Sequence, residues 1–211
     1  MTKKNVTAIF PTPIFTYEDV KEITTEEFNI AENELDTYHN VGNKTSLDSY
    51  ILDRDVFKDL KNVLTDKVNT YFQEVYEPVN EDLKLYITQS WLNFTTEGGH
   101  HHSHSHGNSI VSGVFYFRAD KEIDQIVFVR RQNLDYLNTF DLAIEKKQTS
   151  DFNAEFWGVN VDTNMLVMFP STVTHQVNTT TNTNVRISLA FNTFIRGTLG
   201  SKKNLTEIKL L

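Results

Sequence analysis

Five of the seven histidines of this 211-residue chain lie between residues 100 and 106. Side chains two residues apart on a β-strand point to the same face, so His104 and His106 can direct two imidazoles at one ion. Two other interpretations compete with a metal site. An artificial tag would be terminal and uninterrupted, and a polar loop can be rich in histidine by accident. The strand spacing favours the metal site.

A pair of imidazoles alone is a weak site, so a third ligand is expected from a neighbouring strand. Outside the run the histidines are His39, in a part expected to be helical, and His175. His175 follows an apolar segment and a turn and then enters another expected strand, so it can lie at the same end of a barrel. Three imidazoles leave about half of the coordination positions of an octahedral iron ion open, as oxygen activation requires. Zinc, copper and nickel also bind imidazole ligands, so the ligand type does not identify the metal.

Eleven residues after His175, Arg186 and Ser188 share one face of an expected strand whose other face is apolar. If the apolar face packs outward, Arg186 points into the barrel. A buried arginine needs an anionic partner, and the sequence offers no evident carboxylate for it. A bound dicarboxylate would serve, gripped by the guanidinium and by the Ser188 hydroxyl. An edge arginine in a surface salt bridge is the alternative, which the spacing from His175 disfavours.

The secondary structure that must position these residues is expected to change from helices to strands along the chain. Apolar residues at three- and four-residue spacing predict an amphipathic helix over residues 56–75, after a polar helix from about Thr24 to Tyr38. Strand-like runs separated by turn residues then follow, at 83–94, 109–117, 126–130, 165–169, 172–177 and 185–195. Helices followed by many short strands predict an α+β fold, a double-stranded β-helix (jelly roll) with N-terminal helices packed on one sheet.

Length and composition set outer limits on the function. The chain suits a single domain over residues 1–211, with a helical flank at 1–80, a jelly-roll core at 81–196 and a C-terminal tail at 197–211. The lack of cysteine excludes thiol catalysis and fits a cytoplasmic location. No apolar run reaches the roughly 18 residues of a membrane span. The net charge of −8 disfavours nucleic acid as a partner, and the oligomeric state stays open, a homodimer included.

The chain resembles the 2-oxoglutarate- and Fe(II)-dependent oxygenases, most closely a family from bacteria and phages that is related to the prolyl 4-hydroxylases. The resemblance rests on short blocks in the expected order over most of the chain. They are FPTP at 10–13, WLN at 91–93, HSHGNS at 104–109, SGVFY at 112–116, FPS at 169–171 followed by His175, RIS at 186–188 and FN at 191–192. The ordered set, rather than any single block, is specific.

The resemblance implies a role for each of these candidate residues. His104 and His175 would bind Fe(II), with His106 at the position where the wider superfamily has Asp or Glu. Arg186 and Ser188 would hold the distal carboxylate of the co-substrate 2-oxoglutarate, and the flanking strands would add contacts from Asn93 and Tyr116. The implied reaction decarboxylates 2-oxoglutarate to succinate and carbon dioxide and hydroxylates a small-molecule or peptidyl substrate.

Two alternatives share this architecture. A cupin-type metal-binding protein would use the same barrel, and Gly98 before His104 and Pro170 before His175 match parts of its motifs. A cupin normally adds a glutamate ligand shortly after the histidine pair, and no glutamate stands there in this chain. It also has no counterpart of Arg186. The other alternative is a non-catalytic phage structural or interaction protein on the same fold.

Overall fold

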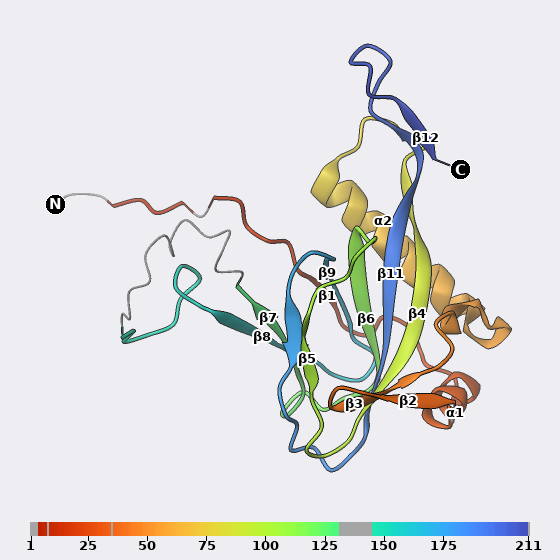
Figure 1. The fold of residues 1–211 in the computed structure, drawn as a ribbon, viewed down its shortest axis with the longest axis vertical. Helices are drawn as coiled ribbons and strands as arrows, with labels where there is room; N and C mark the ends of the chain where they lie inside the picture. The colour runs from red at the N-terminus through yellow and green to blue at the C-terminus, as the bar shows by residue number, and fades with distance from the viewer. Residues whose placement is uncertain (1–3, 8, 35, 131–144, 211) are drawn as a thin grey trace.

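Two β-sheets face each other in the computed structural model, which describes residues 4–7, 9–34, 36–130 and 145–210 (Figure 1). The larger sheet has eight strands, in the order β1 (Phe15–Tyr17), β9 (Leu166–Pro170), β6 (Val111–Arg118), β11 (Arg186–Leu199), β4 (Lys84–Thr95), β3 (Asn43–Ser46) and β2 (Thr37–Asn40), with β12 (Ile208–Leu210) paired to β11. The smaller sheet has four, in the order β5 (His101–His104), β10 (His175–Val177), β7 (Gln125–Val129) and β8 (Phe156–Asn160).

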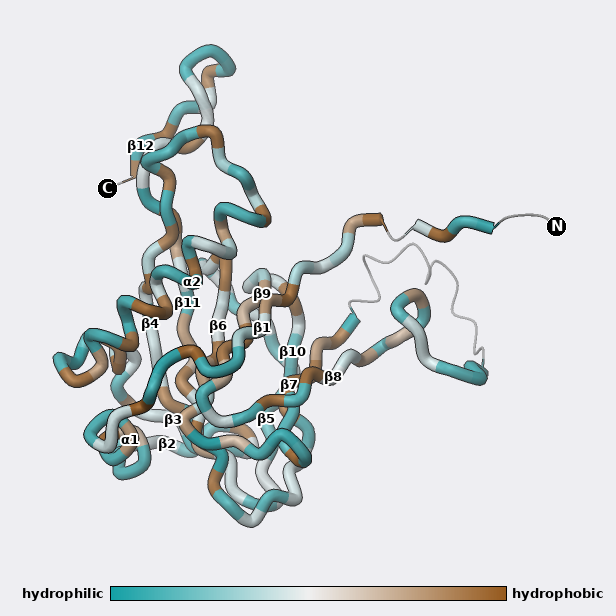
Figure 2. The backbone as a smooth tube through the Cα atoms, turned by 180° about the vertical axis from the view of Figure 1, so that it is seen from behind, coloured by the Kyte–Doolittle hydropathy of each residue, from teal (hydrophilic) through white to brown (hydrophobic). Residues whose placement is uncertain are grey.

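Helix α2 (Lys58–Tyr76) covers the outer face of the larger sheet, against β4 (Figure 1). Hydrophilic and hydrophobic stretches alternate along it in Figure 2, as expected of an amphipathic helix. Its buried face is Leu60, Leu64, Val68, Tyr71 and Phe72. Two 3₁₀ turns, Ile51–Asp53 and Asp55–Phe57, lead into it. The predicted helix over 56–75 is therefore confirmed.

The first helix is shorter than the sequence predicts. Helix α1 (Thr25–Glu32) begins at a capping box, in which Thr24 and Glu27 bond each other's backbone N–H groups. The expectation that it runs to about Tyr38 is wrong, because Thr37–Asn40 pairs with Asn43–Ser46 in a hairpin that joins the larger sheet. His39 therefore lies on an exposed strand and not on a helix.

Strand β11 separates the two hydrophobic cores. Its side chains Ile187, Leu189 and Phe191 belong to the core shared with α2. Arg186 and Ser188 alternate with them, so they point toward the smaller sheet and into the space between the sheets. A second core, which includes Tyr116, Ile126, Phe128, Val167 and Phe169, fills part of that space. The expected division of β11 into an apolar face and a polar inward face is confirmed.

The six predicted strands are present as β4, β6, β7, β9, β10 and β11, with ends shifted by a few residues. Strands β2, β3, β5, β8 and β12 are not among the six, since each is only three to five residues long and shows no clear alternation of apolar and polar residues. Pairing with neighbouring strands holds them in the sheets.

In the part of the chain that the structure describes, no helix combines the length and the apolar character that a membrane crossing requires.

Candidate metal centre and co-substrate pocket

His104 and His175 stand directly opposite each other across the β5–β10 pair, and their ring centroids are 4.3 Å apart. His106 lies two residues beyond the end of β5, so the expectation that both near histidines lie on one strand is wrong. The backbone N–H of His106 donates to the carbonyl of Ser171, 2.9 Å away, in the turn before β10. This bond brings the third imidazole back to the other two.

The lone pairs of these imidazoles converge. Nδ1 of His175 bonds the Val173 carbonyl at 3.1 Å, and Nδ1 of His104 bonds the His102 carbonyl at 2.8 Å. A carbonyl oxygen only accepts, so both Nδ1 atoms carry the proton and both Nε2 atoms carry the lone pair.

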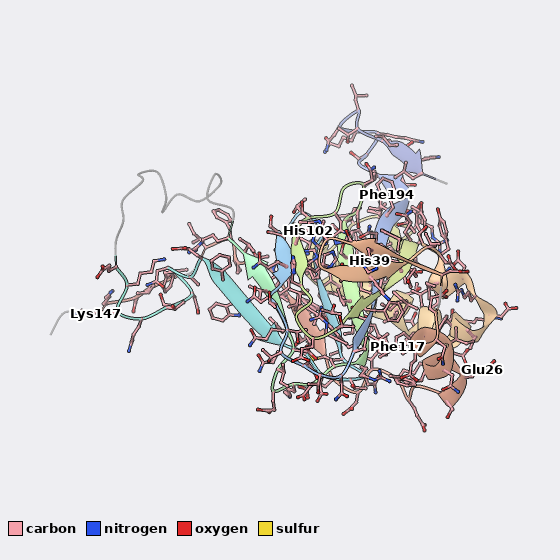
Figure 3. All side chains as sticks on the ribbon, turned by 60° about the horizontal axis from the view of Figure 1, so that its bottom comes forward. Glu26, His39, His102, Phe117, Lys147 and Phe194 are labelled. Atoms are coloured by element: carbon pink, nitrogen blue, oxygen red, sulfur yellow. The ribbon has the colours of Figure 1, made fainter. Side chains whose placement is uncertain are left out.

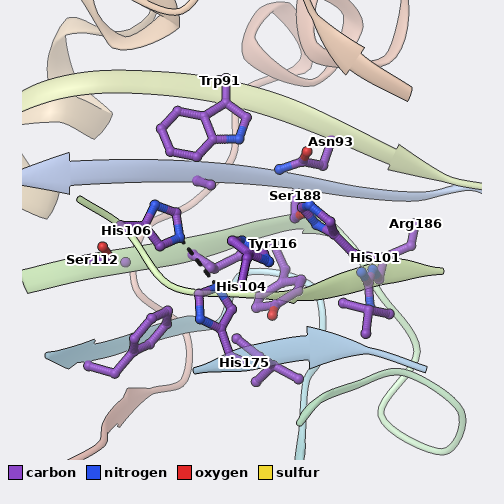
Figure 4. Close-up of a pocket in the computed structure, with 16 residues that line it drawn as sticks. Trp91, Asn93, His101, His104, His106, Ser112, Tyr116, His175, Arg186 and Ser188 are labelled. Carbon is purple, nitrogen blue, oxygen red and sulfur yellow. Dashed lines mark hydrogen bonds between the residues drawn. The ribbon is translucent and has the colours of Figure 1, made fainter. Parts of the chain in front are cut away.

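The spacing of the ring nitrogens suits one metal ion. The Nε2 atoms of His106 and His175 lie 3.3 Å apart (Figure 4), and one ring nitrogen from each of the three histidines lies within 4.8 Å of the others. Metal–nitrogen bonds of about 2.0–2.1 Å place neighbouring ligand atoms roughly 3 Å apart. The donor set therefore fits a metal ion.

Burial keeps these histidines neutral. It lowers the pKa of His175 to about 3 and that of His106 to about 4, and it also lowers the pKa of His104. Only the unprotonated ring can bind a metal ion, so all three are ready ligands at neutral pH. A hydrogen bond with the side chain of Asn192 opposes the lowering at His106 without reversing it.

Aromatic neighbours fix two of the rings. Trp91 stacks on His106 with ring centroids 5.7 Å apart, and Phe169 lies against His175 at 4.6 Å. Trp91 comes from β4 and Phe169 from β9, so both belong to the larger sheet. The smaller sheet supplies His104 and His175, and the larger sheet supplies the surfaces that hold the rings in place.

A buried arginine lies in the same pocket (Figure 4). Arg186 is 4% exposed, and its Nη atoms make two long hydrogen bonds, to the carbonyl of Gln125 (3.4 Å) and to Oγ1 of Thr95 (3.5 Å). Its Nε has no hydrogen-bond partner, and no carboxylate of the described residues lies within ion-pair distance of the guanidinium.

The buried acid Asp124 forms no ion pair with Arg186. The carboxylate of Asp124 accepts hydrogen bonds from the Asn182 side chain at 3.1 Å and from the Asp120 backbone at 3.0 Å. A buried guanidinium without a counter-ion is costly, so this end of the pocket is suited to a bound anion.

Three of the residues predicted to contact the co-substrate form one row across the larger sheet. Ser188 on β11 is the partner of Asn93 on β4 and of Tyr116 on β6. All three are buried and line the pocket. Burial raises the pKa of Tyr116 to about 12, so its phenol stays protonated and can donate a hydrogen bond. The Asn93 Oδ1 accepts from Asn43 and Thr45, which orients its amide.

The structure adds residues at the site to which the sequence reasoning assigned no role. Trp91 lines the pocket, and Asn192 bonds the His106 side chain; they entered only as parts of the WLN and FN blocks. His101 also lines the pocket, and burial lowers its pKa to about 3. No periodicity in the sequence distinguishes His101 from the rest of the histidine run.

Residues 89–192 match the model of a protein family described as "Putative 2OG-Fe(II) oxygenase". This segment runs from β4 to β11 and contains every candidate ligand described above. This match confirms the resemblance to the 2OG-Fe(II) oxygenases that the ordered motifs predicted. The match favours that class over a cupin. No curated protein matches the chain in sequence.

Solved structures of such oxygenases share the fold. HygX from Streptomyces hygroscopicus, with nickel and 2-oxoglutarate bound, superposes with a TM-score of 0.59 at 14% identity, over 86% of this chain and 82% of that one. A Pseudomonas putida prolyl-4-hydroxylase gives a TM-score of 0.54 at 16% identity, over 86% and 92%.

A prolyl hydroxylase from Trichoplax adhaerens, in complex with a hypoxia inducible factor peptide fragment, gives a TM-score of 0.53 at 11% identity, over 86% of this chain and 83% of that one. At these identities the likeness concerns the fold, and it confirms the predicted double-stranded β-helix.

Proposed function

We propose that this chain is a 2-oxoglutarate- and Fe(II)-dependent dioxygenase that hydroxylates a small-molecule or peptidyl substrate. One observation carries the proposal. The pocket that holds three converging neutral imidazoles also holds Arg186, a buried cation with no anionic partner among the described residues. A metal ion and a chelating dicarboxylate would satisfy both ends of the pocket at once.

His104, His106 and His175 would hold the iron. Because every ligand is a neutral imidazole, the ion would keep its full dipositive charge and attract an anionic chelator strongly. The three ring nitrogens converge from two neighbouring segments, β5 with the turn after it and β10. Positions on the far side of the ion therefore remain free for the co-substrate and for oxygen.

The opposite end of the pocket would hold the distal carboxylate of 2-oxoglutarate. Arg186 can donate two hydrogen bonds to it, including one from the Nε that has no partner now. Ser188 and Tyr116, neighbours in the sheet, can add O–H donors. Asn93 is a further pocket neighbour of Ser188.

When bound, iron and 2-oxoglutarate supply the oxidation: dioxygen and 2-oxoglutarate yield succinate and carbon dioxide, and one oxygen atom enters a substrate C–H bond. Trp91 and Phe169 flank the ligand rings and help to exclude water.

Two of the structural relatives support the substrate classes. One HygX structure contains hygromycin B, a small molecule, and the Trichoplax adhaerens enzyme is in complex with a peptide fragment. Substrate recognition in such folds depends on the loops around the pocket rather than on the sheet itself.

The proposal is tested by the affinity for 2-oxoglutarate, measured by calorimetry on the nickel-loaded chain. We expect Arg186→Ala to weaken 2-oxoglutarate by more than about 100-fold with nickel affinity unchanged, because a buried charge-assisted contact is lost. Arg196→Ala is the matched control, since Arg196 lies on the same strand and is exposed. Undiminished affinity in Arg186→Ala, or no binding by the nickel-loaded wild type, would refute the assignment.

A further inference from the structure

An irregular register places one more histidine inside the pocket. Across the β5–β10 pair, His175 is opposite His104 and Val177 is opposite His101, so three steps on β5 match two steps on β10. In a regular strand residues three apart face opposite ways, whereas an extra residue in one strand breaks this alternation. The bulge therefore puts His101 on the same side as His104, and both line the pocket.

His101, His102 and His104 form a second group of imidazoles beside the proposed iron site. Their ring centroids are 4.5 Å apart for His101 and His104 and 5.1 Å apart for each of the other two pairs. One ring nitrogen from each of the three lies within 4.8 Å of the others, as in the first set.

The lone pair of His101 is also available. Its Nε2 accepts a long hydrogen bond, 3.4 Å, from the Asn40 side-chain amide in the β2–β3 hairpin. A metal ion would replace a weak donor there and would not have to displace a proton.

The two groups share one ligand that cannot serve both. The Nδ1 of His104 is bonded to the His102 carbonyl, so His104 has a single lone pair, on Nε2. A metal ion held by His101 and His102 can take that lone pair only by withdrawing it from the set formed with His106 and His175.

We propose that His101, His102 and His104 form a second site for a divalent transition-metal ion, which competes with the first for His104. The site is open to solvent, since His102 is exposed and a groove lined by residues 100–103 and 176–179 runs beside it. Ions that favour imidazole ligands, such as Zn²⁺ and Cu²⁺, suit it. The inference depends on the histidine geometry and not on the oxygenase activity.

Zinc titration of the metal-free full chain by calorimetry tests this site. His175→Gln disables the first set, and we expect this variant to keep one zinc ion within about 10-fold of the wild-type affinity. His102→Ala added to it should weaken zinc by more than about 100-fold. The control is His39→Ala in the same background, because His39 is exposed and belongs to neither set (His39 and His102 are labelled in Figure 3).

Three results would overturn the proposal. One is a folded His175→Gln variant that binds no zinc, and another is zinc binding that is unchanged on adding His102→Ala. The third is a wild-type chain that binds two zinc ions equally tightly, since the shared lone pair requires the second to be much weaker. If His175→Gln does not fold, His106→Gln replaces it, because His106 is only half-buried and lies outside the strands.

Discussion

The Nε2 atoms of His106 and His175 lie 3.3 Å apart although 69 positions separate the two residues in the chain. The rings are parallel, with an interplanar angle of 3°. The Trp91 ring stacks on His106, and the Phe169 ring contacts His175. This arrangement directs two imidazoles at one point, as a shared metal ion requires.

Substitution of His106 shows whether this position is a metal ligand. We expect His106→Ala to weaken Fe(II) by more than about 10-fold, whereas His106→Asp keeps most of the affinity because a carboxylate is the usual third ligand at such iron sites. Anaerobic competition with a coloured chelator measures both. Equal affinities of His106→Ala and wild type would show that His106 is not a ligand.

The stability of the metal-free chain should depend on pH through its buried histidines. The pKa of His175 is about 3 in the folded chain and about 6.5 when unfolded, so the unfolded state binds more protons between these values. Stability is unaffected above about pH 6.5 and falls below it, by at most about 1.4 kcal/mol per pH unit for this residue.

Urea unfolding of the wild type and of His175→Gln at pH 7.5 and pH 5.5 isolates this effect. The wild type should lose more stability than the variant between the two pH values, because glutamine does not titrate. If both chains lose the same amount, His175 does not remain neutral in the folded state.

The positions of the ligands were only partly predictable from the sequence. His175 and Arg186 were placed correctly relative to the sheet, because each lies in or next to a strand with a clear apolar pattern. The exact course of β5 was not predictable, since a run of histidines and a serine has no hydrophobic alternation to set its register. His101 reaches the pocket through a bulge, and His106 through a backbone bond to Ser171.

The β2–β3 hairpin was missed for a similar reason. Its strands are polar, and residues 37–40 follow a segment with helix-start signals. The side chains of Asn43 and Thr45 on β3 bond the Asn93 side chain on β4, which stabilises the hairpin. Asn93 is 50 and 48 residues further along the chain, so no local sequence pattern predicts these contacts. Local propensity was overridden by tertiary pairing.

Gly113 should tolerate no side chain. A Cβ added there would lie 2.2 Å from Cζ of Phe191, whose ring packs directly on this glycine. We expect Gly113→Ala to lower the free energy of unfolding by about 1–3 kcal/mol, because Phe191 must move. Gly107→Ala, with nothing within 4 Å of the new Cβ, is the control. Equal urea midpoints for the two variants would contradict this packing.

The visible absorption of the chain with Fe(II) and 2-oxoglutarate, recorded without oxygen, tests the central claim most directly. If His104, His106 and His175 hold iron that 2-oxoglutarate chelates, a weak charge-transfer band appears when both are added and is absent with either alone. His175→Gln should lose the band, and Arg196→Ala should keep it. A wild-type chain that demonstrably binds iron and yet shows no band at saturating 2-oxoglutarate would contradict the account.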